Sequence, residues 1–235
     1  MNPRVPALHV DGSDGSTGAV ALVLHGGRAK GNGAVRANQL AVLRMRPFAT
    51  SLHRAGARHG LAVARLQYLV RGWNGSIRSP VADVTWALDQ LAEQYPDAPV
   101  ALVGHSMGGR AAMYAAGHAS VRAVVGLAPW IEPGDPFAQL AGRRVLIAHG
   151  DLDRMTSSPA SAAYARDAAR VAASVSYVAI HSERHAMLRR AQLWHELTTG
   201  YVLAVMCGAS PDGTVGVESA NIVEKALSGQ GSLVV

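Results

Sequence analysis

The segment Gly104-His105-Ser106-Met107-Gly108 decides which fold this chain is expected to adopt. It follows a short apolar run, residues 100–103, and precedes a stretch of small residues, 109–116, that is typical of a helix. A Gly-x-Ser-x-Gly sequence between a strand and a helix indicates a nucleophile elbow. The turn is so tight that the residues two before and two after the serine must lack bulk, and glycine stands at both. The serine oxygen is then held clear of the sheet, at a helix N-terminus that favours developing negative charge.

Apolar runs that end in polar motifs flank the elbow on both sides. Upstream, residues 19–24 form a continuous apolar run that leads into His25-Gly26-Gly27. Downstream, residues 145–148 lead into His149-Gly150-Asp151-Leu152-Asp153. A third apolar run, residues 175–180, precedes a further histidine at position 185. Each run is typical of a strand that is covered on both faces.

These motifs supply a candidate catalytic triad, Ser106, Asp153 and His185. Serine, then acid, then histidine is the chain order of the triad in α/β-hydrolases. The acid and the histidine are 185 − 153 = 32 residues apart, which leaves room for one helix and one strand. Asp151 and His181 are the competing candidates for acid and base. The segment resembles the His-Gly-x-x-Asp spacing of α/β-hydrolases, which implies Asp153 as the acid, and a position between the last strand and the last helix favours His185.

Over roughly residues 18–206 the chain resembles the α/β-hydrolase superfamily, and within it a small, uncapped serine hydrolase. The resemblance is carried, in the family's order, by His25-Gly26-Gly27, Arg71-Gly72-Trp73-Asn74-Gly75, the elbow, His149-Gly150-Asp151-Leu152-Asp153 and His185. Two positions depart from the family pattern. Arg184 stands where many members have a glycine before the catalytic histidine, and Gln67-Tyr68 stands where an acidic residue is usual. The resemblance implies serine chemistry, for which we expect neither a cofactor nor a metal ion.

Serine chemistry assigns a role to each candidate residue. A serine hydroxyl is a weak nucleophile at neutral pH, so His185 is expected to take its proton during attack. Asp153 is expected to hold the imidazole in the useful tautomer and to stabilise the imidazolium. The tetrahedral oxyanion needs two backbone N–H donors. We assign them to Met107 and Gly27, with Arg28 as the alternative to Gly27.

Two further histidines stand beside these residues in the sequence. His25 directly precedes the oxyanion glycines, and we expect it to order their loop rather than to do chemistry. His105 directly precedes the nucleophile, and we expect its side chain to pack against the adjacent strands.

The whole chain alternates apolar strands with helices. Strands are expected at residues 20–24, 61–66, 100–103, 121–126, 145–149 and 175–180. Helices are expected to begin near Pro47, at Ser79-Pro80 and at Ser158-Pro159, where a serine cap precedes a proline, and a last helix at about 186–206. This alternation predicts an α/β fold, a doubly wound, mostly parallel sheet with helices on both faces. Residues 127–144 have room for a loop and one short helix instead of a cap, so we expect an open site.

Length and composition place the chain among globular proteins. Its 235 residues make one large domain, for which we expect a hydrolase domain over residues 1–207 and a loosely ordered C-terminal extension over 208–235, with a dimer arm or a lid as the alternative. No apolar stretch reaches the length of a membrane span, and we expect no signal peptide. The single cysteine, Cys207, allows no internal disulfide. We expect a cytoplasmic protein, and a homodimer is left open.

The charge distribution is uneven. The chain carries a formal net charge of +6, and residues 15–82 contain no aspartate or glutamate. This basic span could attract an anionic substrate or an acidic carrier protein, with Arg28 as a substrate-binding residue. Solvated surface from an arginine-rich composition explains the same pattern, and we favour that interpretation. Nucleic-acid binding is not expected, because no recognised motif accompanies the charge.

The function expected from these observations is hydrolysis of a small-molecule carboxylic ester or thioester through an acyl-enzyme. An acyltransferase or thioesterase acting on a carrier-bound acyl group would use the same residues. A cofactor-free lyase or peroxidase of the same fold would also keep the triad. A non-catalytic binding protein would be expected to have lost a triad member, and none is missing here.

Overall fold

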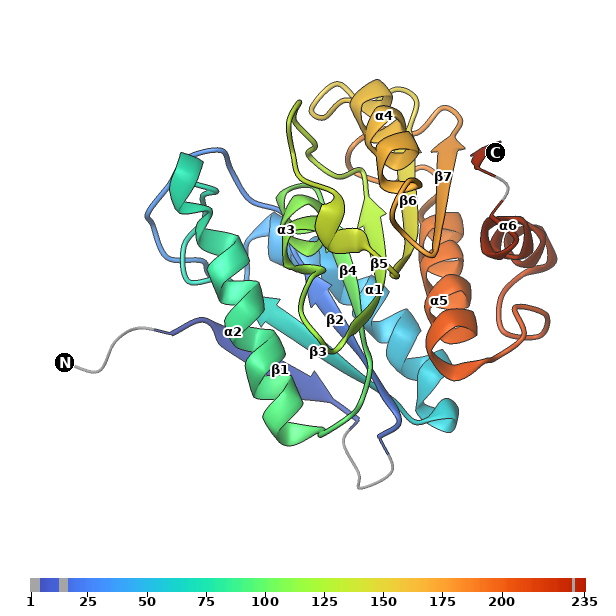
Figure 1. Cartoon of the computed structure of the whole chain (residues 1–235), viewed down its shortest axis with the longest axis horizontal. Coiled ribbons are helices and arrows are strands. Elements are labelled where there is room, and N and C mark those ends of the chain that lie inside the picture. Colours follow the sequence, from blue (N-terminus) through green and yellow to red (C-terminus); the bar gives the residue numbers. More distant parts are fainter. Residues whose placement is uncertain (1–4, 13–16, 230) are drawn as a thin grey trace.

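The computed structural model describes residues 5–12, 17–229 and 231–235, which form a sheet covered by helices on both faces (Figure 1). The eight strands lie in the order β1-β3-β2-β4-β5-β6-β7-β8, and only β1 runs antiparallel to its neighbour. Their bounds are β1 Ala7–Asp11, β2 Ala19–Leu24, β3 Leu61–Gln67, β4 Val100–His105, β5 Val121–Leu127, β6 Arg144–Gly150, β7 Ser174–Ile180 and β8 Ser232–Val234. The predicted α/β class and the mostly parallel, doubly wound sheet are therefore confirmed.

In the part of the chain that the structure describes, six α-helices connect and cover these strands. They are α1 Leu40–Gly56, α2 Ser79–Gln94, α3 Met107–Ala115, α4 Ser158–Ala168, α5 Ala191–Cys207 and α6 Val217–Leu227. Among the described residues, no helix is both long and apolar enough to cross a membrane.

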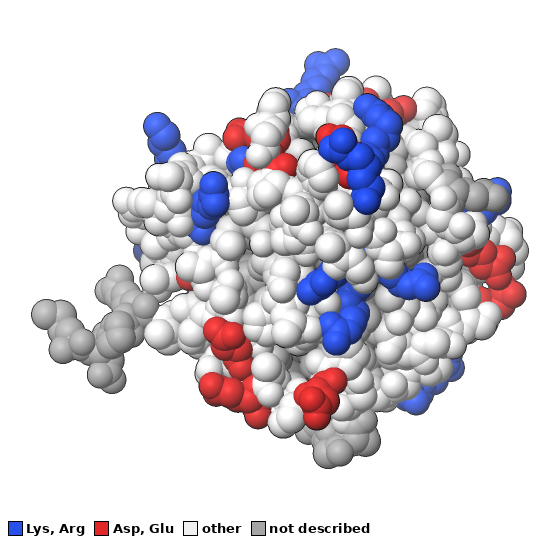
Figure 2. Space-filling model, in the orientation of Figure 1, with Lys and Arg blue, Asp and Glu red and all other residues white. Residues whose placement is uncertain are grey.

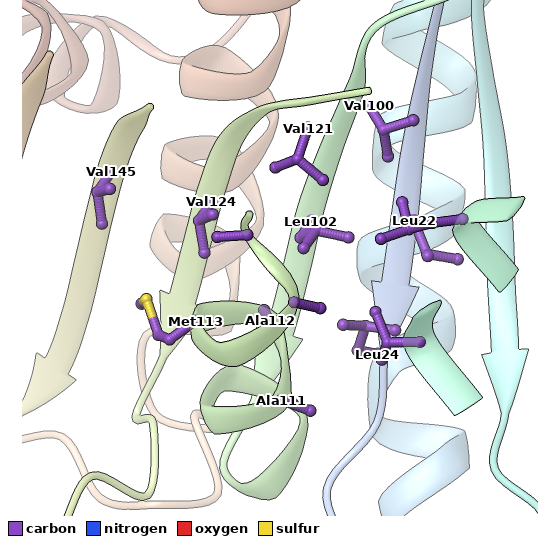
Figure 3. Packing of buried hydrophobic residues seen from close by; sticks show 14 of the residues in the cluster. Leu22, Leu24, Val100, Leu102, Ala111, Ala112, Met113, Val121, Val124 and Val145 are labelled. Carbon is purple, nitrogen blue, oxygen red and sulfur yellow. The ribbon is translucent and has the colours of Figure 1, made fainter. Parts of the chain in front are cut away.

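The central strands are buried on both faces because their side chains alternate between two apolar cores. Leu22 and Leu24 of β2 belong to the core that α2, α3 and α4 cover, together with Leu102 of β4. Figure 3 shows these side chains beside Ala112 in α3. The alternate residues of β2, Ala19, Ala21 and Val23, face the second core, which is covered by α1, α5 and α6. Two-sided burial of this kind explains the continuous apolar runs in the sequence.

All six predicted strands are present, but several helix boundaries differ. The helix predicted to begin near Pro47 starts at Leu40, so the proline lies inside α1. Burial of Phe48 and Leu52 against the sheet holds the helix together across the missing proline N–H. The helix predicted from residue 186 begins only at Ala191. The buried carboxylate of Glu183 accepts the backbone N–H of the residue before it and so fixes where the helix starts.

The predicted serine caps are shifted by one residue. Ser157 rather than Ser158 caps α4, because its Oγ atom accepts the N–H of Ala160 at 3.1 Å. Ser79 is the first residue of α2, and Arg78, with a positive φ of 50°, precedes it as the N-cap. Pro80 and Pro159 lie in the first turns of their helices, as the sequence predicts.

The C-terminal segment is packed, which contradicts the expectation of a loosely ordered extension over 208–235. Ile222 and Val223 of α6 are buried in the core that contains α5. The short strand β8 then pairs in parallel with β7. Apolar side chains three to four residues apart make α6 amphipathic, and docking against α5 buries that face.

The connection from β5 to β6 is short and places no cap domain over the carboxyl ends of the strands. Between Leu127 and Arg144 its only helical element is one 3₁₀ turn, Ala138–Leu140. The carboxyl ends of the parallel strands, where the elbow lies, therefore carry loops instead of a cap domain.

Candidate active site

Ser106 lies at the sharp turn between β4 and α3, with φ 57° and ψ −118°. A positive φ is costly for a residue with a side chain and marks a backbone held by its surroundings. A Cβ atom on Gly104 would lie 2.3 Å from the carbonyl oxygen of Gly108, and one on Gly108 would lie 2.5 Å from that of Leu24. Neither glycine can be replaced without moving the backbone, so both are required by this turn.

The three residues of the candidate triad are in hydrogen-bonding contact. The Ser106 Oγ atom lies 3.1 Å from His185 Nε2, and His185 Nδ1 lies 2.7 Å from Asp153 Oδ2. The Asp153 side chain is fully buried, and that of His185 is 8% exposed. When the proton of the neutral imidazole is on Nδ1 and forms a hydrogen bond to Asp153, Nε2 is free to accept the proton of the serine hydroxyl.

The Asp153 carboxylate is held in place by more donors than the triad needs. Its Oδ1 atom accepts the backbone N–H groups of Met155 and Thr156 at 2.7 and 3.1 Å. Its Oδ2 atom accepts, besides His185, the Thr156 hydroxyl at 2.8 Å and His149 Nε2 at 3.1 Å. Burial alone would raise the pKa of Asp153, but the hydrogen bonds from His149, His185 and the two backbone N–H groups hold it well below the usual range.

The competing candidates for acid and base form a separate pair. His181 Nδ1 lies 2.8 Å from Asp151 Oδ2, and the His181 side chain is 72% exposed. The structure therefore brings Asp153 and His185 to Ser106 and leaves Asp151 and His181 bonded to each other at the surface.

The proposed oxyanion donors lie on two segments that meet beside Ser106. Met107 is the first residue of α3, so its N–H has no partner within the helix. A Cβ atom on Gly27 would lie 2.5 Å from the Met107 sulfur, so only glycine allows this close approach. The N–H of Arg28 is already bonded to the carbonyl of Arg71 at 2.9 Å. This bond favours Gly27 over Arg28 as the second donor.

Two histidines beside the site, His25 and His105, are buried, and burial lowers the pKa of both. Burial lowers the pKa of His25 to about 4, and its ring bonds the carbonyl of Gly26 and the N–H of Tyr68. The expectation that His25 orders the oxyanion loop agrees with these bonds. Burial lowers the pKa of His105 to about 3. Its Nε2 atom lies 3.0 Å from the carbonyl of His185, so it contacts the triad loop and not only adjacent strands.

The sequence did not indicate two of the residues that hold the candidate acid. His149 stands four positions before Asp153 in the segment that follows β6, and this spacing is a signal that could have predicted the contact. The Nδ1 atom of His149 is in turn hydrogen-bonded to Ser161 at 2.9 Å. Thr156 carried no signal, since its contact depends on the path of the loop after β6.

Arg184, one of the two departures from the family pattern, causes no backbone strain. It is not among the described residues with positive φ, so its position does not require glycine. Its N–H is bonded to Glu183 Oε1 at 2.8 Å. The buried carboxylate of Glu183 also accepts the N–H of Arg190 and so spans the loop that carries His185.

Lysine and arginine side chains occur at several separate places on the surface of the molecule (Figure 2). Arg28 is exposed, and the face shown in Figure 2 carries lysine and arginine in several separate places, with acidic side chains between them. Within the described ranges, no group of three or more histidine, cysteine, aspartate or glutamate side chains is arranged to hold a metal ion.

Comparisons with known proteins agree with this fold. The sequence model of the family described as serine aminopeptidase, S33, matches residues 67–145. No curated protein matches the chain. Several solved structures match it. An α/β serine hydrolase homologue from Coxiella burnetii is 17% identical, with 82% of this chain and 89% of that one covered and a TM-score of 0.61. An α/β serine hydrolase without a lid from Xanthomonas campestris is 17% identical, with 86% and 95% covered and a TM-score of 0.60. An esterase from Pyrococcus furiosus is 14% identical, with 82% of each chain covered and a TM-score of 0.59.

Proposed function

Because the chain has the α/β-hydrolase fold, we propose that it is a serine hydrolase that cleaves a carboxylic ester or thioester through an acyl-enzyme. The observation that carries the proposal is the hydrogen-bonded series from Ser106 through His185 to Asp153, positioned at the elbow. Fold alone does not fix function, so the proposal depends on this site and not on the likeness to other structures.

In the first half of the reaction, Ser106 Oγ attacks the acyl carbon and His185 Nε2 takes the serine proton. The carbonyl oxygen becomes an oxyanion that the N–H groups of Met107 and Gly27 stabilise. Collapse of the tetrahedral intermediate breaks the bond to the alcohol or thiol, which leaves with the proton from His185. In the second half, His185 takes a proton from water as the water oxygen attacks the acyl carbon. Collapse of the second tetrahedral intermediate breaks the bond to Ser106 Oγ, His185 returns the proton to that oxygen, and the carboxylic acid is released.

The uncapped edge supports water as the acceptor. Ser106 is partly exposed, and the connection between β5 and β6 supplies no cap domain over it. An acyltransferase would use the same residues and would have to keep water away from the acyl-enzyme. Hydrolysis therefore remains the proposal, with transfer as the alternative.

A substrate panel tests the reaction class. Nitrophenyl esters of rising acyl length would be compared with acyl-coenzyme A thioesters and with an amino-acid nitroanilide, the last because of the aminopeptidase description. Turnover of an ester or thioester supports the proposal. Turnover of the nitroanilide alone would contradict it and would point to amide cleavage.

Asp153→Asn is expected to lower kcat by about 10⁴-fold, because an asparagine leaves the imidazole in the wrong tautomer. Asp151→Asn is the matched control, since the Asp151 carboxylate is hydrogen-bonded to the exposed His181 ring and not to His185. It is expected to cost less than about threefold. Steady-state kinetics on one nitrophenyl ester compare the two, and the reverse ranking would remove Asp153 from the triad.

Arg28 provides a test of the basic span. If its exposed side chain attracts anionic substrates, kcat/KM for a negatively charged ester should fall as salt is raised, while a neutral ester of similar size stays nearly constant. Arg28→Gln should then lower kcat/KM for the charged ester by about threefold to tenfold at low salt and leave the neutral one unchanged. An equal salt response for both esters would show that the arginines are solvated surface.

A further inference from the structure

One buried arginine beside the nucleophile has no role in the proposed chemistry. Arg110 lies in the first turn of α3, directly after the elbow, and is 5% exposed. Its guanidinium contacts two indole rings that pack edge-to-face against each other, and its Cζ atom lies 4.4 Å from the centroid of Trp73 and 4.6 Å from that of Trp130. Its Nη2 atom donates to Asp135 at 2.7 Å and to Glu132 at 3.0 Å. We call Trp73, Arg110, Tyr114, Trp130, Glu132 and Asp135 the Arg110 cluster.

In the Arg110 cluster, one guanidinium faces two carboxylates. Asp135 is buried and accepts the Tyr114 hydroxyl at 2.7 Å and the N–H of Glu132 at 3.0 Å, besides Arg110. Burial alone would lower the pKa of Arg110, but its hydrogen bond to Asp135 and the two carboxylate charges raise it above the ordinary value. The Arg110 Nε atom is buried without a hydrogen-bond partner among the described residues, so stacking and the Nη2 bonds set the position of the guanidinium.

Arg110 and Trp130 of the cluster are hydrogen-bonded to the peptide group that follows the nucleophile. The backbone N–H groups of Arg110 and Trp130 both donate to the carbonyl oxygen of Ser106, each at 3.1 Å. That carbonyl and the N–H of Met107 belong to one planar peptide group. Fixing the direction of the carbonyl therefore fixes the direction of the first proposed oxyanion donor.

Trp73 of the cluster is hydrogen-bonded to the segment that follows Gly27. The N–H of Trp73 donates to the carbonyl of Arg28 at 2.8 Å, and the N–H of Arg28 donates to the carbonyl of Arg71 at 2.9 Å. Arg28 is thus bonded at both its N–H and its carbonyl to the segment that contains Trp73. The second proposed donor directly precedes this paired residue, so its position depends on where the Trp73 ring is held.

We propose that Arg110 is a positioning residue for the oxyanion site. In contact with both Trp73 and Trp130, its guanidinium acts as a clamp that holds the segments carrying Met107 and Gly27 in a fixed arrangement. This inference rests on the proposed function. A planar guanidinium can stack on two rings while it bonds a carboxylate, whereas a lysine ammonium keeps only the charge.

Arg110→Lys tests the clamp while leaving a positive charge beside the buried Asp135. The variant is expected to lower kcat by about 10-fold to 100-fold, because small displacements at a reacting centre are costly, with KM within twofold of the original value. Affinity for a boronic acid, whose serine adduct resembles the tetrahedral intermediate, should fall by the same factor. Trp73→Phe, which leaves the charge pair intact, should give the same split and replaces Arg110→Lys if that variant does not fold.

Arg143→Lys is the matched control. Arg143 also forms hydrogen bonds to the backbone, and its Nε atom donates to the carbonyl of Ala116 at 3.0 Å. It directly precedes β6, so it lies at the amino ends of the strands, opposite the elbow. Its replacement should lower Tm and leave kcat and boronic-acid affinity unchanged. A loss of boronic-acid affinity equal in both arginine variants would overturn the proposal, as would an Arg110→Lys enzyme with the original kcat.

Hydrogen exchange separates this inference from the proposed function, because it needs no substrate. Amides in residues 26–33 should exchange faster in Arg110→Lys than in the original protein, and no faster in Arg143→Lys. A protein that turns over no ester but shows this difference would keep the clamp and lose the proposed function. Unchanged exchange in Arg110→Lys would overturn the clamp itself.

Discussion

Ser106→Ala is expected to abolish both ester turnover and labelling by a fluorophosphonate probe. Without the hydroxyl at the elbow no acyl-enzyme can form, and loss of a triad nucleophile typically costs about 10⁶-fold in kcat. The positive φ at this position is a property of the backbone turn, so the substitution should leave the fold and the Tm nearly unchanged.

Ser51→Ala is the control for this experiment. Ser51 lies in α1 and bonds Thr199 at 2.9 Å, remote from the elbow. It should keep both labelling and turnover. Undiminished labelling of Ser106→Ala would mean that another residue is the nucleophile.

His185→Ala is expected to reduce kcat by about 10⁵-fold or more, since the serine then has no base in contact. His181→Ala should keep nearly all activity, because that ring bonds only Asp151 in the surface pair. A folded but inactive His181 variant, with an active His185 variant beside it, would transfer the role of base.

The pH profile is a further test of the base. The base has to be in its neutral form to accept the serine proton, so turnover should be lost along an acidic limb of the pH profile. Asp153 should not contribute to that limb, because its hydrogen bonds keep its pKa far below the usual range and it stays ionised throughout. Two ionisations on the acidic side would contradict this assignment.

The six central strands could be predicted because each is buried on both faces and therefore reads as an uninterrupted apolar run. The edge strands could not. β1 has five residues, of which three are partly buried and two are exposed, and β8 has three residues whose pairing depends on the free edge of β7. A strand this short has no sequence pattern of its own, and the neighbour that stabilises it is far away in the chain.

The triad could be predicted because its members follow strand ends in a fixed order. The residues that support it could not, since they meet only through the paths of loops. Thr156 reaches Asp153 after the chain turns back from β6. Arg110 meets Trp73 and Trp130 from three separate segments with no shared periodicity. Physical contact of this kind is set by tertiary packing, which a single sequence does not display.

The central claim is that an acyl group passes through Ser106, and trapping that intermediate tests it most directly. A nitrophenyl ester would be mixed with excess enzyme, quenched in acid within the first turnover, digested, and analysed by peptide mass spectrometry. The account predicts an acyl adduct on the peptide that contains Ser106, absent from Ser106→Ala and accumulating in the first turnover. An adduct on any other residue, or full ester turnover by Ser106→Ala, would contradict the account.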